Sequence, residues 1–199
     1  MDTLYLKTCA GSKVWSKPVS KLSKDELKTA FALSSVVGLR MFGLFLIMPV
    51  FSAYATHLAG ATPLLVGLAI GIYGFGQALL QVPVGLLSDR IGRHLTISLG
   101  LLVFVAGSVL AALSHGIDGI IAGRALQGLG AVSGASQALA ADHSNPDNRS
   151  KVMGIIGVSI GAAFVLAIIL SAPLAALAGL PGLFGLTALL ALGAIGLLW

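Results

Sequence analysis

The fold is decided by one short stretch, GLLSDRIGRHL at residues 85–95. No Asp, Glu, Lys or Arg occurs between Arg40 and Asp89, and then Asp89, Arg90 and Arg93 follow within a few positions. Long apolar runs stand on both sides of this charge. In a chain with only 10% charged residues, such a dense charged stretch indicates a tight polar connection between two membrane-spanning helices.

The composition of the whole chain agrees with a membrane protein. Its 199 residues are 57% hydrophobic and their mean hydropathy is +0.99, which soluble domains rarely reach. The net charge of +5 comes from a basic N-terminal segment and short connections rather than from a continuous basic stripe. This distribution favours a lipid bilayer as partner and excludes nucleic acid, and the single cysteine excludes an internal disulfide framework.

Six apolar runs are long enough to span a bilayer, which takes about 20 helical residues. We therefore expect an all-α polytopic membrane protein whose six helices form one bundle at residues 25–199, after a basic tail at residues 1–24 that lacks stable structure. The last two runs are separated by AGLPG at 178–182, because glycine and proline interrupt helices. The expected spans are 27–54, 63–87, 95–113, 117–141, 151–177 and 183–199.

Charge alternates between the connections of these spans. The N-terminal tail and the connections at 89–94 and 142–151 hold all the lysines and arginines outside the spans, whereas the other three connections hold none. By the positive-inside rule, the N-terminus and both charged connections are expected in the cytoplasm. The first helix opens with SKDE, in which Ser23 and Glu26 can form a capping box.

The charged connection resembles motif A of the major facilitator superfamily, which joins helices 2 and 3 of that fold. RALQGLGA at 124–131 resembles the family's motif B on helix 4. The resemblance implies a bacterial inner-membrane transporter that moves a small molecule by alternating access, exporting an amphipathic compound with the proton as possible coupling ion. It also implies that the six spans form two inverted three-helix repeats.

By the same resemblance, motif A is a conformational switch. Asp89 would contact the second half of the transporter, and Arg93 would pair with Asp142 at the end of the fourth span. Arg149 lies near enough in the sequence to join this group. The switch residues are Gly85, Asp89, Arg90, Gly92, Arg93, Asp142 and Arg149.

Two arginines lie deep inside predicted spans, Arg40 in the first and Arg124 in the fourth. An intramembrane arginine is costly unless it faces water or a partner, so a functional role is the first hypothesis. The two alternatives for the partner of these arginines are an anionic solute and carboxylates from a missing second half of the transporter. Polar neighbours either line a cavity or hydrogen-bond between helices. The candidates are Arg40, Tyr73, Gln77, Gln81, Arg124 and Gln127.

Glycines four residues apart predict close helix packing, because small residues let helix backbones approach one another in lipid. The pairs are Gly67/Gly71, Gly130/Gly134 and Gly157/Gly161.

An intramembrane hydrolase of the rhomboid type is the rival class. GVSIG at 157–161 matches the nucleophile-elbow pattern, but its serine needs a histidine as base. All four histidines lie at the ends of predicted spans, so we expect no enzyme. No cofactor is expected, and His57 with His115 are too few ligands for a metal.

The superfamily uses twelve or more spans in two bundles. We therefore expect this chain to be a fragment or truncated half whose partner is the missing C-terminal half, or else a half-transporter that pairs with a second copy.

Overall fold

The computed structural model describes residues 23–130 and 132–199, so most of the predicted tail lies outside the described part. All regular secondary structure among these residues is α-helical, as expected. The helices are α1 (Lys24–Ala55), α2 (Pro63–Ile91), α3 (Arg93–Leu113), α4 (Ile117–Leu129), α5 (Ser133–Asp142) and α6 (Arg149–Leu198).

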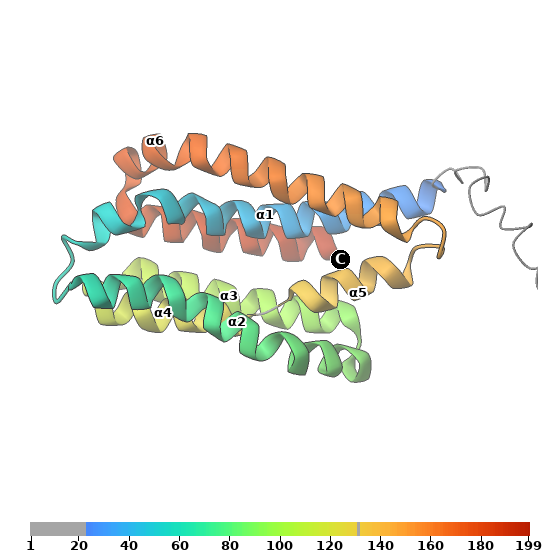
Figure 1. The fold of residues 1–199 in the computed structure, drawn as a ribbon, viewed down its shortest axis with the longest axis horizontal. Coiled ribbons are helices and arrows are strands. Elements are labelled where there is room, and N and C mark those ends of the chain that lie inside the picture. Colours follow the sequence, from blue (N-terminus) through green and yellow to red (C-terminus); the bar gives the residue numbers. More distant parts are fainter. Residues whose placement is uncertain (1–22, 131) are drawn as a thin grey trace, which may run out of the picture.

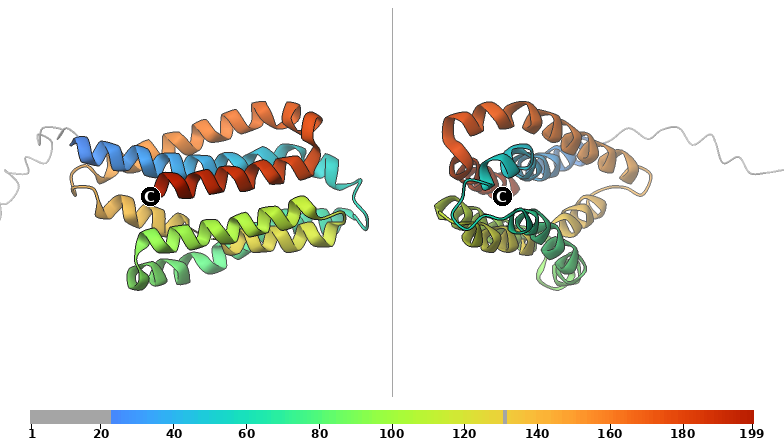
Figure 2. Two further views of the ribbon diagram at one scale, coloured as in Figure 1. Left: turned by 180° about the vertical axis from the view of Figure 1, so that it is seen from behind. Right: turned by 60° about the vertical axis from the view of Figure 1, so that its left-hand side comes forward.

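The helices form two layers that share one long direction. In Figure 1 and in the reverse view of Figure 2, α1 lies beside both runs of α6, and α2, α3, α4 and α5 form the second layer. The end of the bundle at which α2 meets α3 is also the end at which α5 finishes. Charged side chains from several helices are thereby brought together.

Among the described residues, four helices are long and apolar enough to span a membrane: α1, α2, α3 and α6. Helix α6 has 50 residues, but Gly179 interrupts it with φ 64° and ψ −174°. The chain reverses direction there (Figure 1). The interruption lies in the predicted AGLPG break, and the two runs of α6 correspond to the fifth and sixth expected spans.

The prediction of one continuous helix over 117–141 is wrong. Helix α4 has 13 residues and α5 has 10, and the chain leaves helical geometry at Gly130 (φ −74°, ψ 40°). Glycine has a low helix propensity. At Gly130 it also permits close contact with α3, because an added Cβ would lie 2.5 Å from the carbonyl oxygen of Gly100.

The connection between α2 and α3 is shorter than expected. Instead of a loop of about six residues at 89–94, α2 continues through Ile91 and α3 begins at Arg93. Gly92 alone makes the turn, with φ 95°. This backbone conformation is costly for other residues and readily adopted by glycine.

Close packing through glycine occurs between helices other than those expected. An added Cβ at Gly67, Gly71, Gly157 or Gly161 would meet nothing within 4 Å. Tight crossings join α4 to α3 and to α2 instead. A Cβ at Gly123 would lie 2.7 Å from the carbonyl oxygen of Gly107, and one at Gly107 would lie 2.6 Å from that of Gly123. The prediction of close helix packing from glycines four residues apart was therefore wrong for Gly67/Gly71 and Gly157/Gly161.

Buried apolar side chains form a large cluster toward each end of the bundle and a small one between them. The small cluster consists of Leu44, Tyr73, Phe104 and Ala191. It adjoins buried polar groups, because Tyr73 and Phe104 both contact arginine side chains. The middle of the bundle is thus where charge replaces apolar packing.

Candidate functional site

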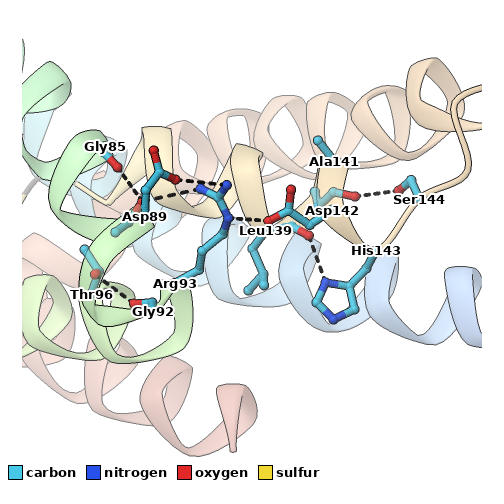
Figure 3. A network of polar contacts seen from close by, with 12 residues as sticks. Gly85, Asp89, Gly92, Arg93, Thr96, Leu139, Ala141, Asp142, His143 and Ser144 are labelled. Carbon is cyan, nitrogen blue, oxygen red and sulfur yellow. Dashed lines mark hydrogen bonds and ion pairs between the residues drawn. The ribbon is translucent and has the colours of Figure 1, made fainter.

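A charged cluster formed by Asp89, Arg93 and Asp142 lies where α2, α3 and α5 meet (Figure 3). Arg93 is the first residue of α3, and its Nη2 lies 3.1 Å from Oδ1 of Asp89, one turn earlier on α2. Its Nε donates to Oδ2 of Asp142, the last residue of α5. The Nη1 group lies 3.4 Å from Oγ of Ser88. One guanidinium therefore joins three helix ends.

Electrostatics explains why both carboxylates need this arginine. Asp89 and Asp142 lie in the last turns of α2 and α5, where the helix dipole disfavours negative charge. The carboxylates remain 57% and 49% exposed. Ion pairs this exposed contribute at most about 1 kcal/mol each. The cluster therefore has a specific geometry, but breaking its ion pairs costs little free energy.

The remaining motif A candidates have supporting positions. Gly85 accepts a hydrogen bond from Ser88 Oγ at 2.6 Å, and Gly92 makes the turn before Arg93. The Arg90 side chain is exposed. Arg149 lies beside the cluster rather than in it, because its Nε donates to the carbonyl of Ala141 at 3.2 Å.

Glu26 connects α1 to the segment that follows α5. The expected capping box is present, since Glu26 N donates to Ser23 Oγ and Ser23 N donates to the Glu26 carboxylate. The same carboxylate accepts from the backbone N–H of Asn145 at 2.9 Å and from Nδ2 of Asn148 at 3.0 Å. These partners are more than 100 residues away in the chain, so no local pattern revealed them.

An arginine cluster formed by Arg40, Tyr73, Arg124 and Gln127 lies in the middle of the bundle. Both arginines are only 2% exposed. Nη2 of Arg40 donates to the Tyr73 hydroxyl at 3.1 Å, and the Arg124 guanidinium carbon lies 4.7 Å from the centroid of the Tyr73 ring. One tyrosine thus contacts both cations, through its hydroxyl and through its ring.

Arg124 is held by hydrogen bonds across three helices. Its Nε donates to the carbonyl of Ala69 on α2 at 3.3 Å, and its Nη1 donates to Oε1 of Gln127 at 3.1 Å. Nε2 of Gln127 in turn donates to Oγ of Ser108 on α3 at 2.7 Å. Every acceptor in this chain of bonds is electrically neutral.

Arg40 contacts the break between α4 and α5. Its Nη2 lies 3.4 Å from the carbonyl oxygen of Gly130, and its Nη1 lies 3.4 Å from Oγ of Ser133. Nε2 of Gln77 donates to the same hydroxyl at 3.2 Å. Sequence reasoning missed Ser133. The available signal, a serine inside an apolar run, is weak because serine commonly bonds to its own helix.

Five of the six candidates on the predicted spans therefore come together, and the exposed Gln81 does not. Within residues 23–130 and 132–199, no Asp or Glu forms an ion pair with either buried arginine. No group of three or more metal-ligating side chains occurs in the same residues.

Ser159, the serine of GVSIG, serves helix packing. Its hydroxyl donates to the carbonyls of Ser34 and Ile156, each at 3.0 Å. It lies on an apolar groove of about 660 Å³ between α1 and the first run of α6, whose walls include Phe31, Phe42, Val158 and Leu166. The arrangement is that of a binding surface or a helix interface rather than of a catalytic serine.

Long apolar helices around buried arginines, with a charged cluster at one end, define a multi-pass α-helical membrane protein. The sequence profile of the Major Facilitator Superfamily matches residues 33–199. The chain belongs to this family.

Two relatives are named as transporters, and a third is named as a drug-resistance protein. The inner membrane transport protein YajR of Escherichia coli is 51% identical over 150 residues, which cover 75% of this chain. An uncharacterized transporter of Buchnera aphidicola is 46% identical over 155 residues. The quinolone resistance protein NorA of Staphylococcus aureus is 28% identical over 141 residues, 70% of this chain and 36% of NorA.

The fold recurs in a solved structure, that of the POT family transporter PepTSo. It matches with a TM-score of 0.76 at 17% identity, over 86% of this chain and 36% of that one. The chain covers 33% of YajR and 39% of the Buchnera protein. It therefore spans little more than a third of the length of these relatives.

Proposed function

We propose that this chain is a six-span bundle of a secondary transporter that moves a small molecule by alternating access. Family membership supports transport. Helices α1, α2 and α3 supply three spans, α4 and α5 together supply the fourth, and the two runs of α6 supply the fifth and the sixth. The second bundle comes from further sequence, as in the longer relatives, or from a second copy of the chain.

The charged cluster is the observation that carries this proposal. Its ion pairs are exposed and weak, yet one guanidinium holds the ends of α2, α3 and α5 together. Contacts of this kind break and re-form without loss of the fold, as a switch between two bundle arrangements requires. Arg93 is the central switch residue, and in this arrangement it pairs with Asp89 and Asp142 at the same time.

The substrate is an amphipathic compound, and the direction is export from the cytoplasm. The name of NorA indicates drug resistance for that relative, and the apolar groove between α1 and α6 supplies a surface suited to an apolar portion of a solute. Proton coupling needs a group whose protonation changes during the cycle. In the described residues no carboxylate forms an ion pair with the arginine cluster.

The exchange Arg93→Ala tests the switch in a chimera in which this chain replaces the matching region of YajR. We expect export of a fluorescent amphipathic dye that the unaltered chimera transports to fall at least tenfold. Stability is expected to fall by at most about 2 kcal/mol, because the two pairs that are lost are exposed. Dye accumulation in cells and thermal unfolding of the purified chimera measure the two quantities.

Lys28→Ala is the matched control for Arg93→Ala, because it also removes an exposed cation near the same end of the bundle. It should leave efflux unchanged. Equal efflux from Arg93→Ala and the parent chimera would overturn the switch role.

Membrane orientation is tested with the only cysteine of the chain, Cys9. If the N-terminus is cytoplasmic, an impermeant maleimide should label Cys9 only after intact cells are permeabilised. A variant that combines Cys9→Ser with His57→Cys should be labelled from outside, because His57 is exposed at the opposite end of α1. The reverse pattern would invert the assigned topology.

A further inference from the structure

The Glu26 carboxylate joins the starts of two helices. Glu26 is only 6% exposed, and its carboxylate accepts a hydrogen bond from the backbone N–H of Ser23 at 2.8 Å. The same group accepts from the backbone N–H of Asn145 at 2.9 Å and from Nδ2 of Asn148 at 3.0 Å. Ser23 is the N-cap of α1, and Asn148 is the N-cap of α6. Because the dipole makes each helix start positive, a carboxylate between the two starts is favoured.

The turn that Glu26 holds is closed by its own hydrogen bonds. The carbonyl of Asn145 accepts from the backbone N–H of Asn148 at 2.8 Å and from that of Arg149 at 3.1 Å. Oδ1 of Asn148 accepts from Nζ of Lys151 at 3.0 Å. The turn is therefore ordered internally, and Glu26 fixes where it lies against α1.

The same turn is bonded to the end of α5, which carries Asp142. Nε of Arg149 donates to the carbonyl of Ala141 at 3.2 Å. Ala141 directly precedes Asp142, whose carboxylate accepts from Arg93 (Figure 3). Hydrogen bonds and short chain links therefore lead from Glu26 on α1 to the charged cluster at the start of α3.

We propose that Glu26 is a positioning residue of the switch, which holds the turn at 145–149 against α1 and thereby keeps Asp142 within reach of Arg93. The inference rests on the proposed role of the charged cluster and adds the residue that sets its geometry. The hydrogen bonds to Glu26 are charge-assisted and buried, and bonds of this kind are strong. The ion pairs of Arg93 are exposed and weak. The contacts of Glu26 therefore persist when the ion pairs open, and the cluster re-forms in the same place.

The position of the α5 end is measured without transport, by electron paramagnetic resonance on the full chain in lipid nanodiscs. Spin labels are attached to Ile91→Cys and His143→Cys, two exposed positions at the ends of α2 and α5, in a Cys9→Ser background. We expect one narrow distance distribution in this labelled parent and one at least twice as broad in Glu26→Ala. Arg93→Ala should broaden the distribution as well.

Ser23→Ala is the matched control for Glu26→Ala. It removes the hydroxyl that caps α1 but neither of the long-range bonds to the Glu26 carboxylate, so the distribution should stay narrow. Equal broadening in Ser23→Ala would assign the effect to the cap of α1 and overturn the proposal. If Glu26→Ala fails to fold, Asn148→Ala decides in its place, because it removes one donor and leaves the capping box intact. A distribution as narrow as that of the parent, in either variant, would also overturn the proposal.

Export by the YajR chimera shows whether Glu26 acts through Arg93. Glu26→Ala is expected to lower export of the dye about fivefold, and adding Arg93→Ala should lower it less than twofold further, because residues that act through one contact are not additive. Independent effects would multiply to about fiftyfold and would contradict the positioning role. Because the spin-label measurement requires no transport, a narrow distribution in Glu26→Ala would leave the transport function standing, and a chimera without export would leave the spin-label result valid.

Discussion

Replacing Gly123 with valine is expected to lower the free energy of unfolding by about 3 kcal/mol, because the new side chain overpacks a rigid crossing. A Cβ there would lie 2.7 Å from the Gly107 carbonyl oxygen and 2.8 Å from the backbone nitrogen of Ala111. Backbone atoms cannot move aside as the end of a flexible side chain can, so α3 and α4 would separate. Thermal unfolding in detergent and the yield of monodisperse protein measure the effect.

Gly71→Val is the matched control for Gly123→Val. It places the same side chain on a long apolar helix, at a glycine whose added Cβ meets nothing within 4 Å. Its effect on stability should stay within about 0.5 kcal/mol. If the two variants unfolded alike, the α3–α4 crossing would not be the tight contact described above.

Replacing Gln127 with leucine is expected to cost about 2 kcal/mol, because a buried bond to a charged group is lost. The leucine is close in size, but it can neither accept from Nη1 of Arg124 nor donate to Oγ of Ser108. Both partners are buried, so water does not readily replace the missing bonds. Denaturant titration of the helical circular dichroism signal gives the change in free energy.

Gln81→Leu is the control for Gln127→Leu. It separates the loss of the buried hydrogen bonds from the general effect on stability of replacing a polar side chain with an apolar one. Gln81 is exposed on α2, and the substitution should be neutral within about 0.5 kcal/mol. A loss at Gln81 as large as that at Gln127 would contradict the hydrogen-bonded chain from Arg124 to Ser108.

Much of the fold follows from the sequence, because long apolar runs and charged connections leave few arrangements for a chain in lipid. The tight connection between the second and third spans and the break at Gly179 were predicted from local composition. The proximity of Arg93 to Asp142 followed from the resemblance to motif A rather than from local chemistry.

Features that depend on contacts between distant segments were missed. The break between α4 and α5 needs the close approach of Gly130 to Gly100 and a hydrogen bond from Arg40, none of which is visible in residues 117–141 alone. The hydrogen bonds that Asn145 and Asn148 donate to the Glu26 carboxylate also join segments far apart in the chain. The i, i+4 glycine rule failed because it identifies small residues without showing which face meets another helix.

The interrupted helix also constrains how the protein is made. An arginine inside a spanning segment costs up to about 2.5–3.5 kcal/mol on insertion, the value at the helix centre. The segment 117–142 carries Arg124 and consists of two helices of 13 and 10 residues. Arg124 donates to Ala69 and Gln127 donates to Ser108, and both acceptors precede this segment in the chain, so the ribosome delivers them first. Glycosylation mapping should find the isolated segment poorly inserted and the segment preceded by residues 24–113 fully inserted. Integration of the fourth segment into the bilayer is then a folding step guided by earlier helices rather than an independent partitioning event.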